Sequence, residues 1–209
     1  EILKIDTEGH PQWHLVRAAE IIRSGGVIAY PTDTIYGLGA NPFNEKAIKR
    51  IFAIKRREGE NPILLLIAHK KEVVNLTRGV SPVAKRLISA FWPGPLTMIF
   101  EASASLPSCL LGGTGKVGLR LPDSKIVSWL ISLTGHPITA SSANKSGGQN
   151  PLNAADVLNS FDDEIDLILD AGPSLTSQAS TVIDVSIFPP CLIREGVIGF
   201  TEIERVIRQ

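Results

Sequence analysis

Short apolar runs alternate with helical segments along almost the whole chain, and this alternation limits the possible folds more than any other feature. Val27–Tyr30 lies between glycine and proline, and Ile63–Ile67 follows a proline; both runs are typical of buried strands. Between them, Asn44–Ile54 carries its apolar side chains at helical spacing. Strands that alternate with helices form α/β proteins, and we expect a mixed sheet with parallel and antiparallel neighbours.

The same patterns continue toward the C-terminus without an internal repeat, a low-complexity segment or a linker. We therefore expect one domain over residues 1–209. The segment PTDTIYGLGAN (31–41) should be an irregular loop, because threonine, glycine and turn residues dominate it. Further helices are expected at 11–23, 71–76, 81–91, 124–133, about 154–159 and from 201, and further strands at 97–100, 117–121, 138–141, 165–169, 181–185 and 191–194.

Charge and cysteine usage exclude several classes of protein. The 21 basic and 21 acidic residues cancel, so the chain as a whole is not a polyelectrolyte that binds nucleic acid, although a local basic groove is compatible with this balance. The sequence contains no run of about 18 apolar residues, so we expect no transmembrane helix, and residues 1–10 do not have the pattern expected of a signal peptide. Cys109 and Cys191 stand alone, which favours reduced core residues in a cytoplasmic protein. The four histidines form no ligand grouping, so we expect no metal site.

Two nucleotide-binding motifs are nearly present but fail. GGTGKVGLR (112–120) resembles a P-loop, yet Leu110 replaces the first glycine and Val117 replaces the serine or threonine after the lysine. YGLGANPF contains Gly37 and Gly39 but lacks the third glycine of a dinucleotide fingerprint. A bound nucleotide would therefore need a different phosphate cradle.

Four polar segments lie at the expected ends of strands and helices, where sheet proteins place ligands. They are PTDT (31–34), KRR with Asn61 (55–61), SSAN (141–144) and Ser180-Thr181 with Arg194. Guanidinium groups bind phosphate or carboxylate bidentately, and lysine adds a mobile positive charge. Such a set suits phosphoryl or nucleotidyl transfer, in which catalysis consists mostly of positioning and charge stabilisation.

Structural interpretations of the same segments stay open at this point. Lys55–Arg57 could be a solvated helix end, where a cation adds only about 0.3–1 kcal/mol to stability. SSANKSGG (141–148) could be an ordinary loop, and WPGPLT (92–97) a packing corner.

Taken in order, however, the motifs resemble the YrdC family over roughly residues 12–208. The matching elements are YPTDTIYGLGAN (30–41), the K-x-R of Lys55 and Arg57, NP (61–62), WPGPLT (92–97), VGLRLPD (117–123), the S-x-N of Ser142 and Asn144 followed by Ser146-Gly147, STVID (180–184) and IREG (193–196). The resemblance is to the short form of the family, which lacks a C-terminal extension. It implies a twisted mixed sheet that encloses a deep basic cleft.

The resemblance also implies an activity, that of a nucleotidyltransferase which makes threonylcarbamoyl-AMP and pyrophosphate from ATP, L-threonine and bicarbonate. Mg²⁺ would arrive with the triphosphate, and a downstream transferase complex would pass the threonylcarbamoyl group to tRNA. Thr34, Arg120, Ala140 and Ser180 resemble the threonine site. The positions that resemble the ATP site are Lys55, Arg57, Asn61, Ser142, Asn144, Asn150 and Arg194, of which Lys55, Arg57, Ser142 and Asn144 resemble the catalytic residues.

Four positions depart from the usual pattern: Glu58 replaces proline, Leu66 replaces a frequent histidine, Ser141 replaces the proline of a frequent P-S-A-N, and Ala179 replaces glutamate. Ile35 and Leu66 are candidates to receive the threonine methyl group. Two other functions use similar modules, namely a double-stranded RNA or tRNA binder and the carbamoyl-transfer part of a hydrogenase-maturation enzyme. Dependence of pyrophosphate release on threonine and bicarbonate separates the three.

Overall fold

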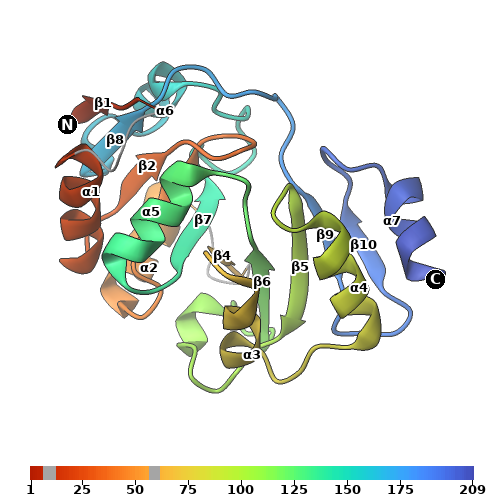
Figure 1. Ribbon diagram of the computed structural model, residues 1–209. Coiled ribbons are helices and arrows are strands. Elements are labelled where there is room, and N and C mark those ends of the chain that lie inside the picture. Colours follow the sequence, from red (N-terminus) through yellow and green to blue (C-terminus); the bar gives the residue numbers. More distant parts are fainter. Residues whose placement is uncertain (7–12, 57–61) are drawn as a thin grey trace.

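The computed structural model describes residues 1–6, 13–56 and 62–209, apart from the side chain of Asp162 (Figure 1). Ten strands among these residues form one sheet in the order β1-β8-β2-β3-β7-β4-β6-β5-β9-β10. Neighbours are parallel in four pairs, such as β4 with β6 and β5 with β9, and antiparallel in the others. The strands are β1 (Ile2–Lys4), β2 (Ile28–Tyr30), β3 (Gly37–Gly39), β4 (Leu64–Leu66), β5 (Leu96–Glu101), β6 (Lys116–Arg120), β7 (Ile138–Ser142), β8 (Leu167–Asp170), β9 (Thr181–Asp184) and β10 (Cys191–Arg194).

The expected helices are present, and their described ends lie within two residues of the predicted ones. The predicted start of the first helix at residue 11 lies outside the described residues. The helices are α1 (Trp13–Arg23), α2 (Glu45–Lys55), α3 (Val73–Leu76), α4 (Pro82–Phe91), α5 (Lys125–Thr134), α6 (Ala154–Phe161) and α7 (Phe200–Ile207), with short 3₁₀ turns at Lys70–Glu72, Ser108–Leu110 and Asp162–Glu164. Side-chain caps account for several boundaries. Asn44, for example, accepts hydrogen bonds from the backbone nitrogens of Lys46 and Ala47 at 3.0 and 3.2 Å, and so starts α2.

The mixed α/β architecture is confirmed, but the prediction of an irregular loop at 31–41 is wrong in its second half. Gly37–Gly39 forms β3, which pairs antiparallel with β2 and with β7. Gly39 makes room for the side chain of Tyr30, because a Cβ atom at this position would lie 2.6 Å from its ring. That buried ring reaches across the strand, and its hydroxyl donates to the Thr139 carbonyl at 2.8 Å. The short strand β1 was not predicted.

Alternate strand residues face opposite sides of the sheet, and each side has its own apolar core. On one side, α1 and α5 pack together over β2, β4, β7 and β8, as Figure 1 shows. The larger core on the other side contains residues of α2, α3, α4, α6 and α7. Among the described residues, β5, β6 and β9 contribute nothing to the α1/α5 core. The sheet on that side therefore continues past the helices without a helical cover.

The cysteines differ from the expectation of two core residues: Cys109 is half-buried and Cys191 is exposed on the edge strand β10, and both are free. None of the described helices has the length and apolar character that spanning a bilayer requires.

Candidate functional site

A cavity of about 390 Å³ lies on the uncovered part of the sheet. Its floor is formed by alternate residues of neighbouring strands, as the two-residue period of a sheet requires. Hydrogen-bonded register places Leu66 of β4 beside Arg120 of β6, and Ile99 of β5 beside Gly118. Thr32, Thr34, Ile35 and Tyr36 form a wall from the loop before β3.

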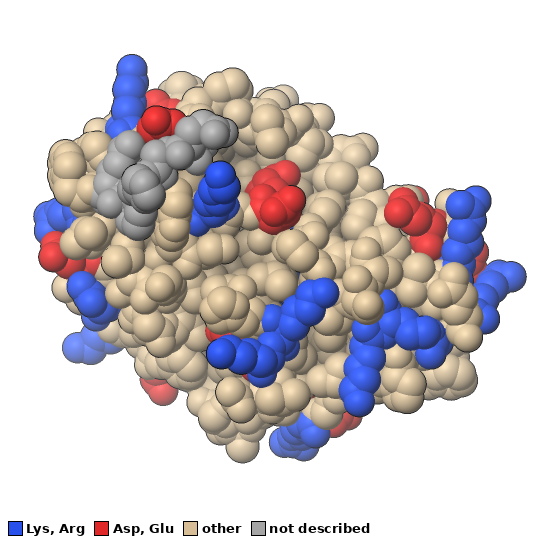
Figure 2. Space-filling model, in the orientation of Figure 1, with Lys and Arg blue, Asp and Glu red and all other residues tan. Residues whose placement is uncertain are grey.

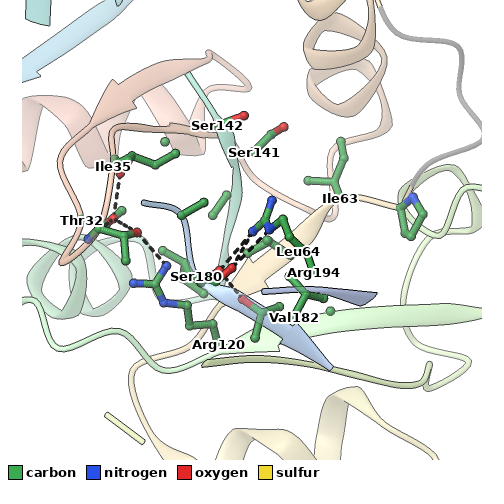
Figure 3. Close-up of a pocket in the computed structure, with 18 of the residues that line it drawn as sticks. Thr32, Ile35, Ile63, Leu64, Arg120, Ser141, Ser142, Ser180, Val182 and Arg194 are labelled. Carbon is green, nitrogen blue, oxygen red and sulfur yellow. Dashed lines mark hydrogen bonds between the residues drawn. The ribbon is translucent and has the colours of Figure 1, made fainter. Parts of the chain in front are cut away.

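Strand directions explain why polar side chains gather at one end of this floor. β6 ends at Arg120 and β10 ends at Arg194, whereas β5 and β9 begin beside them. Thr97 is the second residue of β5, and Ser180 directly precedes β9. The floor away from Arg120 includes Leu64, Gly118, Ile99 and Val182, and Ser141 and Ser142 of β7 follow beyond Leu64. Figure 3 shows Arg120 and Arg194 on either side of Ser180, with Thr32 and Ile35 above them.

Arg120 is only 5% exposed and is held from three directions. Its Nε donates to the Gly94 carbonyl at 3.2 Å, its Nη1 donates to the Thr34 hydroxyl at 3.0 Å, and its Nη2 forms an ion pair with Asp33. A guanidinium group has five N–H donors. Two of them therefore have no partner among the described residues.

The hydroxyl groups beside Arg120 form a buried network. Thr34 Oγ1 lies 3.0 Å from the hydroxyl of Thr32, which donates to the Ile35 carbonyl at 2.8 Å. Ser180 Oγ lies 2.8 Å from the hydroxyl of Thr97, and both residues are buried. The polar end thus presents hydroxyl groups whose positions are fixed before any ligand arrives.

Arg194 differs from Arg120, because it has no acidic partner among the described residues. Its Nη2 and Nε donate to the Ser180 carbonyl at 2.8 and 3.3 Å, and none of the ion pairs between described residues includes it. Although the residue as a whole is exposed, desolvation by the surrounding protein and then the charge of Arg120 lower the pKa of the Arg194 guanidinium. An anion bound here would relieve both effects.

Lys55 lies at the end of α2 but is 3% exposed, which contradicts the interpretation of this residue as a solvated helix end. Its Nζ donates to the carbonyls of Ser142 and Asn144 at 2.6 and 2.8 Å. In addition, Ser146 N donates to the Lys55 carbonyl at 3.3 Å. Lys55 thus holds the loop after β7 in place, and the cavity lining does not include it.

The loop after β7 is also held by its own side chains. Ser142 Oγ donates to Asn144 Oδ1 at 2.7 Å, and Asn144 Nδ2 donates to the carbonyls of Gly148 and Gln149 at 2.7 and 3.0 Å. Asn150 then donates to the Ser177 carbonyl at 3.0 Å and connects this loop to the segment 171–180. Of these residues, Ser142 lines the cavity.

The structure therefore brings six of the predicted site residues to one cavity: Thr34, Arg120, Ala140, Ser142, Ser180 and Arg194. Lys55, Asn144 and Asn150 form the scaffold next to it. Arg57 and Asn61 lie outside the described residues. Figure 2 shows Lys and Arg side chains in several places on the face in view, interspersed with Asp and Glu. The positively charged residues in the lining of the cavity are Arg120 and Arg194.

Two important residues, Asp33 and Thr97, were not assigned a role from the sequence. Asp33 belongs to the polar segment 31–34, so a carboxylate next to a predicted ligand-binding threonine was a usable signal. Thr97 is the last residue of WPGPLT, which we interpreted as a packing corner. Its hydroxyl instead supports Ser180 from the neighbouring strand.

Comparisons with known proteins identify the family of this chain. The family model Sua5_yciO_yrdC, described as "Telomere recombination", matches residues 20–196. The threonylcarbamoyl-AMP synthases of Pyrococcus abyssi and Bacillus subtilis are 41% and 38% identical over 94% and 92% of this chain. The crystal structure of P. abyssi Sua5 complexed with L-threonine superposes with a TM-score of 0.95 at 40% identity, covering 99% of this chain and 61% of that one.

The chain spans 58% and 56% of the lengths of these two synthases. Because one family model covers most of the chain and relatives match nearly all of it, this protein belongs to the Sua5/YciO/YrdC family.

Proposed function

We propose that this chain synthesises threonylcarbamoyl-AMP from L-threonine, bicarbonate and ATP. The threonine amine and bicarbonate form a carbamate with loss of water. A carbamate oxygen then attacks the α-phosphorus of ATP, and the bond from that phosphorus to the β-phosphate breaks, which releases pyrophosphate. The observation that carries the proposal is a pocket that contains two arginines beside fixed hydroxyls and apolar side chains. Arg120 is paired with Asp33, whereas Arg194 has no acidic partner in the part of the chain that the structure describes.

Threonine fits the part of the polar end that Arg120, Thr34 and Ser180 form, which we call the inner end of the pocket. The two available N–H groups of Arg120 can hold the α-carboxylate through a charge-assisted fork. Thr34 and Ser180 offer hydroxyls for the polar atoms of the substrate. Ile35 and Leu66 line the same cavity and are apolar, so they can receive the methyl group that distinguishes threonine from serine. That P. abyssi Sua5 was crystallised in complex with L-threonine supports threonine as a ligand of this chain.

Transfer of the adenylyl group requires cations that stabilise charge on the phosphates. Arg194 provides such a cation inside the pocket, next to the Ser180 backbone. We assign Ser142 to the wall that faces the triphosphate. Lys55, Asn144 and Asn150 would contribute to the ATP site through the loop that they hold in place. Arg57 and Asn61 are kept as ATP-binding residues on the basis of the family resemblance.

Mg²⁺ is expected to arrive with the triphosphate and to keep several of its waters. The product is a mixed anhydride, which a downstream threonylcarbamoyl transferase would consume in modifying tRNA. This places the protein in the cytoplasm and suggests contact with a transferase complex or with tRNA itself.

The test is release of pyrophosphate and formation of threonylcarbamoyl-AMP, measured by coupled assay and mass spectrometry with each substrate omitted in turn. Product should form only with ATP, threonine and bicarbonate together. Serine should be slower by about 10- to 200-fold, because one methyl group contributes about 1–3 kcal/mol in a pocket. Pyrophosphate release without any amino acid would contradict the proposal. Salt-dependent binding of double-stranded RNA without turnover would favour the RNA-binding alternative.

A further inference from the structure

Asp33 lies behind Arg120, outside the lining of the cavity. One carboxylate oxygen pairs with Arg120 Nη2, and the other accepts a hydrogen bond from the backbone nitrogen of Asp123 at 3.2 Å. The side chains of Arg120 and Asp33 are 6% and 11% exposed. In such a dry environment, a single charge influences its neighbours more strongly than it does in water.

This pair divides the charge of the pocket unequally. Arg120 and Asp33 together are formally neutral, whereas Arg194 carries a positive charge that no described carboxylate neutralises. The inner end of the pocket is therefore close to neutral, and the Arg194 end is positive.

We propose that Asp33 is a specificity-determining positioning residue that makes the inner end of the pocket accept a single carboxylate and reject phosphate groups. This inference rests on the proposed function and assigns the two anionic parts of the substrates to different arginines. Asp33 fixes the guanidinium plane of Arg120, so the remaining N–H groups point in defined directions. Coulomb energy grows with ligand charge, so Asp33 repels a phosphate dianion about twice as strongly as a carboxylate.

The experiment measures binding without nucleotide, by calorimetry with L-threonine and by competition between threonine and inorganic pyrophosphate. In the wild type, pyrophosphate should leave threonine binding unchanged. In Asp33→Asn, the threonine Kd should rise about 10- to 100-fold because Arg120 loses its anchor, and pyrophosphate should now displace threonine.

Two further variants separate orientation from charge. Asp33→Glu keeps the negative charge but changes its position, so threonine should bind more weakly while pyrophosphate remains excluded. Asp123→Asn removes an exposed negative charge next to Asp33 and keeps the backbone contact, so neither ligand should change its affinity. Thermal melting of each variant establishes the temperature at which binding is measured.

The inference is overturned if Asp33→Asn still excludes pyrophosphate, or if Asp123→Asn admits it equally well. If Asp33→Asn does not fold, Asp33→Glu decides the question, because competition by pyrophosphate in that variant would also refute the role of the charge. Absence of threonine binding to the wild type would instead refute the proposed function, so the two failures can be told apart.

Discussion

The buried ammonium group of Lys55 leads to a prediction about stability. Replacing Lys55 by Met keeps an apolar side chain of similar length. It removes the two hydrogen bonds that the ammonium group donates to the carbonyls of Ser142 and Asn144, at 2.6 and 2.8 Å. A hydrogen bond from a charged group contributes about 1.5–3 kcal/mol. The free energy of unfolding should therefore fall by about 3–6 kcal/mol, whereas a solvated cation at a helix end would contribute only about 0.3–1 kcal/mol.

Urea denaturation followed by tryptophan fluorescence measures this difference. With a slope of about 2 kcal/mol per molar urea, the midpoint of Lys55→Met should fall by about 1.5–3 M. Lys49→Met is the matched control on the same helix, because the Lys49 side chain is 72% exposed and only weakly paired with Glu45 at 4.0 Å. It should change stability by less than about 0.5 kcal/mol.

A loss in Lys55→Met no larger than that of the control would refute the reasoning. The carbonyls would then not depend on the ammonium group, and Lys55 would be available to face the triphosphate directly, as the sequence pattern suggested.

Two other changes test the fold around the site. Gly39→Ala should destabilise the protein by about 1–3 kcal/mol, because the added Cβ would lie 2.6 Å from the Tyr30 ring. Gly79→Ala is the control and should not lower the melting temperature, because no atom lies within 4 Å of its added Cβ. Burial raises the pKa of the Asp184 carboxyl, but hydrogen bonds from Lys116 and Ser186 outweigh it and hold that pKa below its usual value. The stability from this group is present above the unfolded-state pKa of about 3.9 and is lost as pH falls through the lower folded pKa. Asp184→Asn should therefore be less stable than the wild type at pH 7, and urea midpoints of the two should converge toward pH 2; a constant gap would contradict this assignment.

The sequence predicted the helices and most strands because their signals are local. Asn44 and Ser81 are recognisable caps, and the apolar runs of β2 and β4 are flanked by turn residues. β3 escaped prediction because its two glycines have no strand propensity of their own. They are placed in the sheet by the Tyr30 ring, which belongs to another strand.

The prediction of the site from the sequence was incomplete for a similar reason, namely that long-range contacts decide the surroundings of its residues. Types of side chain identified Arg120 and Arg194 as anion-binding candidates, but their different surroundings arise from long-range contacts. Asp33 and Arg120 are 87 positions apart, and so are Lys55 and Ser142. Three cations in a row at 55–57 resemble a solvated surface, and nothing local indicates that the first is buried under the loop after β7.

The wide separation of the pocket residues also determines when the site can exist during synthesis. Thr34 is followed by Arg194 only after roughly 160 further residues, which takes about 8–32 s at ribosomal rates of about 5–20 residues per second. Arg120 and Asp33 can pair as soon as both have been synthesised. Ser180 and Arg194 join the site only after the segment 171–180 has been made and β9 has paired with β5. The nascent chain therefore has no complete substrate pocket until β9 and β10 have been synthesised. In the finished protein, a ligand that touches both sides should suppress local opening of β9 and β10 more than that of β1, which amide exchange would register strand by strand.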